Sequence, residues 1–183
     1  MRSIPRGPVG TISPRLKPMT NSCKIITRSP EETRELGRRI GALAQPGDVY
    51  LLSGNLGAGK TCFTQGIAVG LGIDEYVMSP SFVLLREHQG RLPLYHVDLY
   101  RLESVDEVAD LGLDDYLYGK GVCVVEWAER ARSVLPAEHL LVNIDYAGDD
   151  ERCFRIEANG KRYCDIISRL KEIYGLQKTE ECS

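Results

Sequence analysis

A glycine-rich stretch in the first half of the chain has the residue types that bind nucleotide phosphates. Residues 54–61 read GNLGAGKT and match the pattern GxxxxGK[ST]. The glycines let backbone N–H groups turn inward around phosphate oxygens, because a Cβ would obstruct that conformation. Lys60 would reach the terminal phosphates, and the Thr61 hydroxyl would ligate Mg²⁺. The predicted nucleotide-binding residues of this loop are Asn55, Leu56, Gly57, Ala58, Gly59, Lys60 and Thr61.

Two acidic residues are candidates for a second metal ligand. Enzymes with such a loop hold Mg²⁺ with a second acid at the end of a neighbouring apolar strand. Glu126 follows the apolar residues 122–125, and Asp98 follows the less uniform residues 94–97. Glu126 ends the cleaner apolar run, so we favour it, and Asp98 is the alternative.

Polar residues alternate around Asp98 in the segment YHVDLYR, residues 95–101. Alternation along a strand places His96, Asp98 and Tyr100 on one face. Such a face would orient an attacking water or a metal-bound water. The alternative is a hydrogen-bonded surface face of a hairpin.

A segment with two hydroxyl side chains, SPSF at residues 79–82, lies between the loop and this strand. In switch proteins, a hydroxyl in this interval senses the γ-phosphate and orders a loop. Considered by itself, the segment is more simply explained as a Ser-Pro turn.

The segments that must position these residues alternate between strand and helix patterns. The glycine loop follows an apolar strand at 48–53 and precedes a helical pattern at 60–71, which is the context that the motif requires. Ser29 and Glu32 predict a capping box at the start of an earlier helix. The other predicted strands are 23–28, 82–88, 92–99, 121–126, 140–146 and 152–157, and the other helices are 29–44, part of 103–118, 128–135 and 161–174. This order predicts an α/β fold of the P-loop NTPase type, with three layers, a partly parallel central sheet and β-hairpins.

Composition limits the classes of function. The chain has 183 residues, 43% of them hydrophobic, a formal charge of −3 and a pI of about 5.7. Proteins that hold nucleic acid alone usually have a basic surface, so we expect any contact with RNA to go through a partner. The six cysteines form no CxxC pair, which favours free thiols in a reducing compartment. No stretch approaches the roughly 20 apolar residues of a membrane span, and we expect a cytoplasmic protein.

One folded domain is expected at residues 23–175. Residues 1–22 carry four prolines and no acid, and we expect a disordered leader, with an early start codon or an organellar presequence as the alternatives. Residues 176–183 would form a flexible tail.

Four motifs together resemble one family. LSGNLGAGKT, SPSF, HVDLYR and VVEWAER, in this order and at these intervals, are similar to the bacterial ATPase of tRNA threonylcarbamoyladenosine biosynthesis, the TsaE family. The similarity covers residues 29–146. The family usually has SPT where this chain has SPS, so Ser81 keeps the hydroxyl and loses the methyl group.

The resemblance implies a role for each matching residue. The protein would bind ATP and Mg²⁺, with Lys60 and Thr61 holding phosphate and metal and Glu126 as the second metal position. Asp98 would be needed for hydrolysis, and Ser81 would keep the switch role. Trp127 would pack beneath the site. The helix start at residues 30–33, which includes Glu32, would lie near the adenine.

The resemblance also implies the biological role. Such a protein hydrolyses ATP slowly and works with a carbamoyltransferase-like catalytic subunit and its paralogous scaffold subunit. That complex attaches threonylcarbamoyl to the adenosine beside the anticodon of ANN-decoding tRNAs. The ATPase would contact tRNA only indirectly and would reset the complex between turnovers.

Two other functions use the same loop. A small-molecule kinase would use Asp98 as a base toward a substrate hydroxyl, with Arg130 and Arg132 as a lid. A nucleotide-locked scaffold would bind the nucleotide without significant turnover. A GTPase is disfavoured because no [NT]KxD guanine motif occurs in the sequence.

Overall fold

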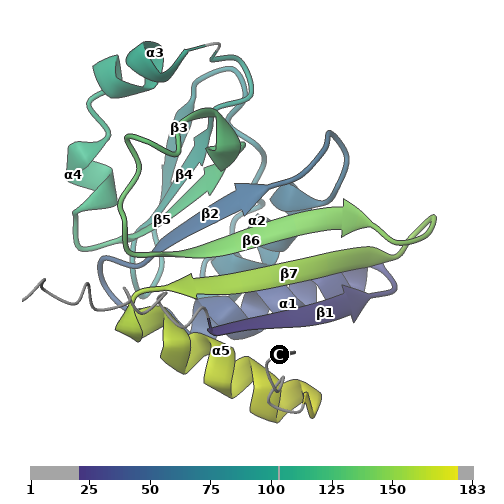
Figure 1. Cartoon of the computed structure of the whole chain (residues 1–183). Coiled ribbons are helices and arrows are strands. Elements are labelled where there is room, and N and C mark those ends of the chain that lie inside the picture. The colour runs from purple at the N-terminus through teal and green to yellow at the C-terminus, as the bar shows by residue number, and fades with distance from the viewer. Residues whose placement is uncertain (1–20, 103, 177–183) are drawn as a thin grey trace, which may run out of the picture.

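The computed structural model describes residues 21–102 and 104–176, which form a seven-stranded sheet with helices on its two faces (Figure 1). Most of the predicted leader and tail therefore lies outside the described residues. The strands are β1 (Asn21–Thr27), β2 (Val49–Ser53), β3 (Leu85–His88), β4 (Leu94–Asp98), β5 (Val122–Glu126), β6 (His139–Tyr146) and β7 (Arg152–Asn159). The helices are α1 (Pro30–Leu43), α2 (Lys60–Gly70), α3 (Val105–Asp110), α4 (Asp114–Leu117), the 3₁₀ helix η1 (Ala128–Arg130) and α5 (Lys161–Tyr174).

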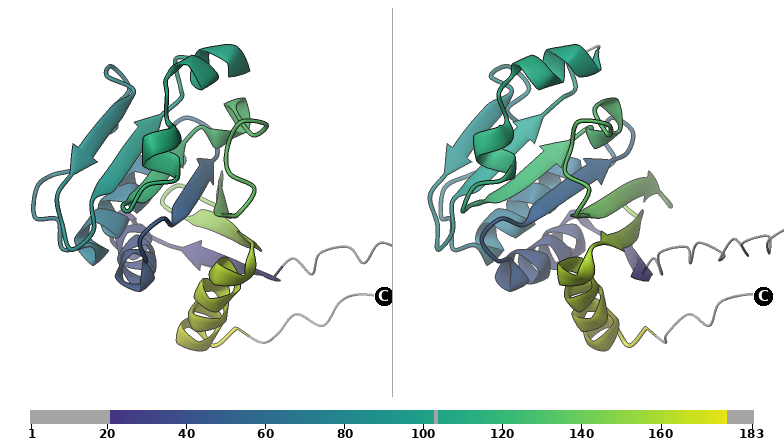
Figure 2. Two further views of the ribbon diagram at one scale, coloured as in Figure 1. Left: turned by 90° about the vertical axis from the view of Figure 1, so that its left-hand side faces the viewer. Right: turned by 60° about the vertical axis from the view of Figure 1, so that its left-hand side comes forward.

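The sheet has the order β1-β7-β6-β2-β5-β4-β3 and is partly parallel, as predicted. β4, β5, β2 and β6 run parallel, so their carboxyl ends lie at one edge of the sheet. β3 pairs antiparallel with β4, and β7 pairs antiparallel with both β6 and β1. The predicted β-hairpins are thereby confirmed, as β3–β4 and β6–β7. The two further views show how the sheet twists between its helices (Figure 2).

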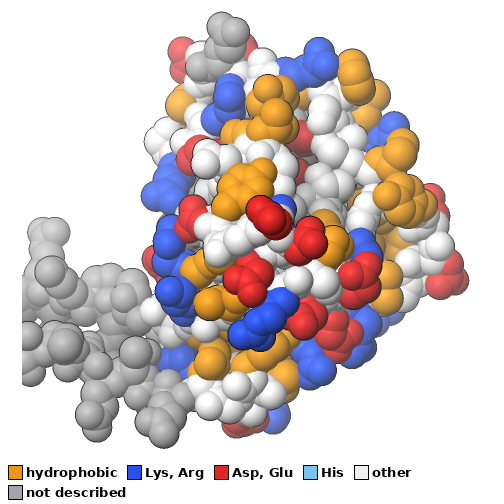
Figure 3. Space-filling view, turned by 90° about the vertical axis from the view of Figure 1, so that its right-hand side faces the viewer, with side chains coloured by type: hydrophobic (Ala, Val, Ile, Leu, Met, Phe, Trp, Pro, Cys, Tyr) orange, Lys and Arg blue, Asp and Glu red, His pale blue; other side chains and the backbone are white. Residues whose placement is uncertain are grey.

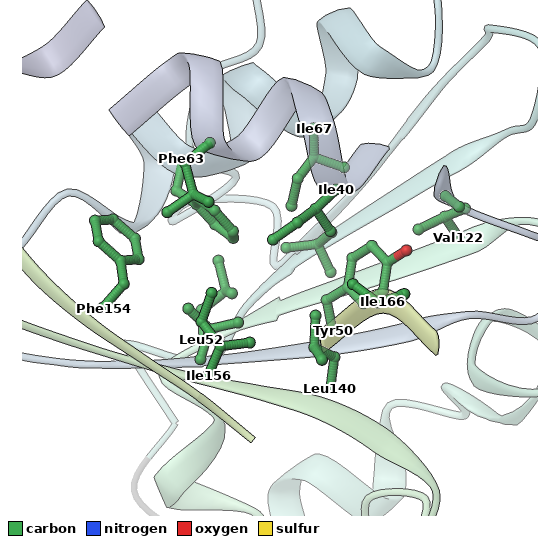
Figure 4. Packing of buried hydrophobic residues seen from close by; sticks show 14 of the residues in the cluster. Ile40, Tyr50, Leu52, Phe63, Ile67, Val122, Leu140, Phe154, Ile156 and Ile166 are labelled. Atoms are coloured by element: carbon green, nitrogen blue, oxygen red, sulfur yellow. The ribbon is translucent and has the colours of Figure 1, made fainter. Parts of the chain in front are cut away.

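The larger core lies between the sheet and the helices α1, α2 and α5. Phe63 and Ile67 of α2 and Ile40 of α1 are fully buried in it. Figure 4 shows these side chains together with Tyr50 and Leu52, which project from β2 toward the helices. Burying a side chain of this size contributes about 1.5–3 kcal/mol. The glycine loop is thus attached at both ends to well-packed elements, β2 before it and α2 after it.

Close contact between α1 and α2 fixes the position of α2. Gly37 and Gly41 of α1 face Gly66 and Gly70 of α2, and a Cβ at any of these positions would meet backbone of the other helix. At Gly37, for example, an added Cβ would lie 2.2 Å from the carbonyl oxygen of Phe63. The spacing of small residues lets the two backbones touch, so larger residues here would displace the helix that begins with the loop lysine.

The second face of the sheet is covered by a thinner layer. Val49 and Leu51 of β2 and Val125 of β5 pack there against α3, α4 and the segment around η1. The helix predicted at 128–135 is wrong, because only Ala128–Arg130 is helical and the rest is turn. No helix in the described parts of the chain is long and apolar enough to cross a membrane.

Several boundaries differ from the sequence prediction. β1 begins at Asn21, two residues earlier than expected, and β3 begins at Leu85 rather than at 82. The predicted capping box of α1 is only partly correct. Ser29 accepts the N–H of Glu32 at 3.2 Å as predicted, but the Glu32 carboxylate accepts the N–H of Arg28, at 2.7 Å, instead of that of Ser29.

Candidate functional site

The glycine loop lies at the carboxyl edge of the parallel strands, between β2 and α2. Gly54, Gly57 and Gly59 have φ angles of 147°, 75° and 105°, a region that favours glycine. Gly59 caps α2, and the first amides of a helix have no partner within it. The helix dipole adds partial positive charge at the same point. This loop therefore fits a phosphate group.

Lys60 is almost completely buried at the centre of the loop, with 5% of its surface exposed. Its Nζ donates to the carbonyl oxygens of Gly54 and Asn55 at 2.6 and 3.0 Å. The same atom lies 3.7 Å from the centre of the Trp127 ring. Burial lowers the pKa of Lys60, and the negative charges of Glu126 and other acids oppose that shift. The ammonium group thus lies in a desolvated pocket, beside the position where phosphates would enter.

Trp127 reaches Lys60 because the chain turns sharply after β5. Its φ angle is 60°, which is uncommon for a bulky side chain. This conformation directs the ring under the ammonium group and starts η1. Trp127, expected to pack beneath the site, thus lies against the loop lysine.

Glu126 faces the first turn of α2. It ends β5 and lies opposite Asp98 in the parallel β4–β5 pair. The Thr61 hydroxyl donates to Glu126 Oε2 at 3.1 Å, and His96 Nε2 lies 2.8 Å from Oε1. Glu126 is 2% exposed and His96 is fully buried. A hydroxyl and a carboxylate in contact are two of the oxygen ligands that a P-loop offers to Mg²⁺, so the pair fits a metal position shared with phosphate oxygens and water.

Asp98 holds the segment with two hydroxyl side chains. Ser79 and Ser81 both donate to Asp98 Oδ2, the latter at 2.7 Å, and the two hydroxyl oxygens lie 2.6 Å apart. Asp98 Oδ1 accepts the N–H of Tyr100 at 2.9 Å. Asp98 is 2% exposed, so the surface-hairpin alternative for His96 and Asp98 is wrong. Only Tyr100, which follows the end of β4, is exposed, at 40%.

These groups surround one cavity of about 350 Å³. Of the residues singled out in the sequence, it is lined by Leu56, Gly57, Gly59, Lys60, Thr61, Ser79, Ser81, Asp98, Tyr100, Glu126 and Trp127. Asn55 lines an adjacent hollow of about 250 Å³. Ala58 is buried, and its carbonyl accepts from Arg152 at 3.1 Å. Glu32 does not line the cavity, although its helix approaches it, since the Cys62 thiol at the cavity wall lies 3.4 Å from the Pro30 carbonyl.

Sequence reasoning left two contacts unassigned. It placed His96 on the same face as Asp98 without its contact to Glu126, and it did not pair Ser79 with Asp98. The alternation of polar and apolar residues at 96–98 was the only sequence feature that pointed to His96. Arg101 also lines the cavity, and its guanidinium carbon lies 4.3 Å from the centre of the Phe82 ring.

Comparison with known proteins gives matches over the part of the chain that contains these motifs. Residues 27–154 match the family described as "Threonylcarbamoyl adenosine biosynthesis protein TsaE". A protein of Bacillus subtilis named tRNA threonylcarbamoyladenosine biosynthesis protein TsaE is 52% identical over 154 residues, which cover 82% of this chain and 96% of the relative. A protein of the same name from Treponema pallidum is 44% identical over 129 residues, covering 70% and 96%.

A solved structure supports the same assignment. The crystal structure of Bacillus subtilis YdiB superposes with a TM-score of 0.74 at 45% sequence identity, and the match covers 85% of this chain and 99% of that one. Fold, sequence motifs and overall sequence similarity agree, and the chain belongs to the TsaE family.

Proposed function

We propose that this protein binds ATP with Mg²⁺, hydrolyses it slowly, and serves the complex that installs threonylcarbamoyl on the adenosine beside the anticodon of ANN-decoding tRNAs. Membership of a family named for threonylcarbamoyl adenosine biosynthesis supports the pathway. One structural observation carries the ATP chemistry. Lys60, the contact between Thr61 and Glu126, and the contact between Ser81 and Asp98 all line one cavity.

Each group has a task that its surroundings favour. Lys60 would exchange its carbonyl contacts for phosphate oxygens, and the amides at the start of α2 would bind the same group. Thr61 and Glu126 would hold Mg²⁺, which supplies charge neutralisation at the phosphoryl oxygens when bound. Asp98, with Ser79 and Ser81, would orient the groups on the γ-phosphate side. Glu32 and the start of α1 would lie near the adenine.

The same geometry favours a switch that resets its partners. Asp98 connects the body of the sheet to the segment that carries Ser79 and Ser81, so a change at the terminal phosphate has a direct route to this segment. Next to these serines, Phe82 and Val83 expose 85% and 56% of their surfaces. We propose that this segment reports the nucleotide state to the carbamoyltransferase-like subunit and its paralogous scaffold subunit in the cytoplasm.

Contact with tRNA would be indirect. The chain has a formal charge of −3. Among the described residues on the face in Figure 3, basic and acidic side chains are interspersed and form no continuous basic area. A protein that binds the phosphate backbone by itself needs such an area. This supports leaving tRNA recognition to the partner subunits.

The kinase alternative is weakened by the contacts of Asp98. A base must be free to accept the proton of a substrate hydroxyl. Oδ2 of Asp98 already accepts two serine hydroxyls and Oδ1 accepts the amide of Tyr100. Transfer of labelled phosphate from ATP to a metabolite would nevertheless restore the kinase interpretation.

Two assays test the proposal. The purified protein should release phosphate from ATP slowly and only with Mg²⁺. Its affinity for the partner subunits should differ between ATP, ADP and no nucleotide, because a switch requires a nucleotide-dependent preference between states. Equal partner affinity in all three conditions would leave only a scaffold, and the absence of hydrolysis would remove the ATPase.

A further inference from the structure

His96 occupies an unusual place beside the candidate metal position. It is a fully buried residue in β4, on the face of the sheet that packs against α2. Its Nε2 lies 2.8 Å from Glu126 Oε1, while its buried Nδ1 has no hydrogen-bond partner among the residues that the structure describes. A buried polar atom without a partner costs free energy, so the ring is not placed there for stability alone.

The contacts of Glu126 divide its two oxygens between different tasks. Oε2 accepts the hydroxyl of Thr61 at 3.1 Å, at the cavity that is lined by both residues. Oε1 lies 2.8 Å from His96 Nε2, with the Thr64 hydroxyl at 3.5 Å. Because Nδ1 has no partner, the ring proton belongs on Nε2, where it can be donated to the carboxylate.

We infer that His96 is a positioning residue for metal binding: its Nε2–H holds Glu126 Oε1, so that Oε2 stays directed at Thr61 and the metal position between them. This inference rests on the proposed Mg²⁺ and ATP function. Groups that orient a metal ligand by hydrogen bonding change metal affinity by about 10–100-fold when they are removed. Without His96, Oε1 would keep only the longer Thr64 contact, and the carboxylate would be freer to rotate.

The geometry provides a pair of substitutions that separates positioning from structure. A glutamine amide nitrogen can take the place of Nε2, whereas an asparagine amide nitrogen reaches only to the place of Nδ1. His96→Gln can therefore still donate to Glu126, and His96→Asn cannot. Both are uncharged amides, so they place comparable polarity in the same buried site.

The chain also offers a matched control. His88 in β3 is 5% exposed and contacts the Glu75 carboxylate at 2.6 Å through Nδ1, and its Nε2 has no partner in the described part of the chain. It does not line the cavity of the glycine loop. By the same geometry, His88→Gln cannot replace this Nδ1 contact, so it breaks a histidine–glutamate contact outside the site, as His96→Asn does within it.

The test is the Mg²⁺ dependence of binding of the non-hydrolysable analogue adenosine 5′-(β,γ-imido)triphosphate, measured by calorimetry on the full chain. We expect His96→Asn to raise the Mg²⁺ concentration for half-maximal enhancement about tenfold or more. His96→Gln and His88→Gln should stay within about threefold of the wild type, and affinity in EDTA should change little in all three.

The outcomes distinguish the inference from the function on which it rests. A wild type that does not bind the analogue, or binds it without regard to Mg²⁺, overturns the proposed function and the inference with it. If the wild type responds to Mg²⁺ and His96→Asn responds equally, the inference alone fails. An equal loss of Mg²⁺ response in His96→Asn and His96→Gln would show that His96 has only a structural role and would also overturn the inference. The same conclusion follows if analogue affinity falls as much in EDTA as with Mg²⁺.

Discussion

Replacing Lys60 by methionine isolates the contribution of its charge to ATP binding. Methionine keeps an unbranched apolar chain of similar length, so the packing beside Trp127 is largely retained. What is lost is the ammonium group of a residue that is 5% exposed, and this group already has two carbonyl contacts. The variant therefore tests whether this buried charge is present for phosphate.

The size of the effect follows from an exchange of contacts. When ATP binds, Nζ would lose its hydrogen bonds to the carbonyl oxygens of Gly54 and Asn55 and form hydrogen bonds to phosphate oxygens. The new hydrogen bonds would therefore be partly offset by the lost ones. The net difference is about that of one hydrogen bond to a charged group, about 1.5–3 kcal/mol. This corresponds to a loss of ATP affinity of about 10–100-fold.

Calorimetric titration with Mg²⁺ and the non-hydrolysable ATP analogue measures this loss. Lys161→Met is a suitable control, because Lys161 is also the first residue of a helix but is exposed. The control should bind as the wild type does. Binding of Lys60→Met within about threefold of the wild type would refute the reasoning, since the free energy of a charge-assisted contact exceeds that difference.

Three further predictions concern other residues. Glu126→Ala should reduce Mg²⁺-dependent hydrolysis more than nucleotide binding, and the reverse assignment of the two acids follows if Asp98→Ala does this and Glu126→Ala does not. Ser81→Ala removes a donor to a buried carboxylate and should slow ATP hydrolysis about tenfold, whereas Ser81→Thr keeps the hydroxyl and should stay within about threefold of the wild type. A Ser81→Ala rate equal to that of the wild type would show that Ser81 has no part in hydrolysis. Burial raises the pKa of Cys123 from 9.0 to about 12, so above pH 9 the unfolded chain loses this proton first and stability falls as pH rises, by up to about 1.4 kcal/mol per unit. Between pH 9 and about pH 10.5, the free energy of unfolding measured in urea should fall less for Cys123→Ala than for the wild type. An equal fall in the two proteins would contradict the burial of this thiol.

Local patterns in the sequence predicted most of the elements. α5 runs from Lys161 to Tyr174 as expected, because Ile166, Ile167 and Leu170 repeat at helical spacing and are buried. The second hairpin was predictable from the turn residues between two alternating strands.

The helix predicted at 128–135 shows how a correct pattern can mislead. Ala128, Ala131 and Leu135 are all buried, at helical spacing, on one side of the segment. Trp127 starts the segment in a left-handed conformation, and turns then present the same residues to the second core. Tertiary packing thus overrode the local preference.

The start of β3 depends on a turn that the sequence did not reveal. The N–H groups of Val83 and Leu84 both donate to the Pro80 carbonyl, at 2.9 and 2.7 Å. Leu84 adopts a φ angle of 65°, and the strand begins only after it. A β-branched and an apolar residue beside Phe82 had favoured an earlier strand.

The individual residues of the candidate site were predictable from the sequence, but the contacts between them were not. The loop residues and the two acids are local motifs, so residue types and spacing identify them. The contact of His96 with Glu126 depends on the strand order that brings β4 beside β5, and this order is a property of the whole sheet. The contact of Ser81 with Asp98 depends on the turn before β3, the strand that pairs with β4.

The most direct test of the account is nucleoside analysis of bulk tRNA from source cells depleted of this protein. The account predicts loss of threonylcarbamoyladenosine, restored by the wild type and not by Lys60→Ala. Such a result would connect the buried lysine of the glycine loop to the tRNA modification. An unchanged level of the modified nucleoside after depletion would contradict the proposed role and direct attention to phosphate transfer.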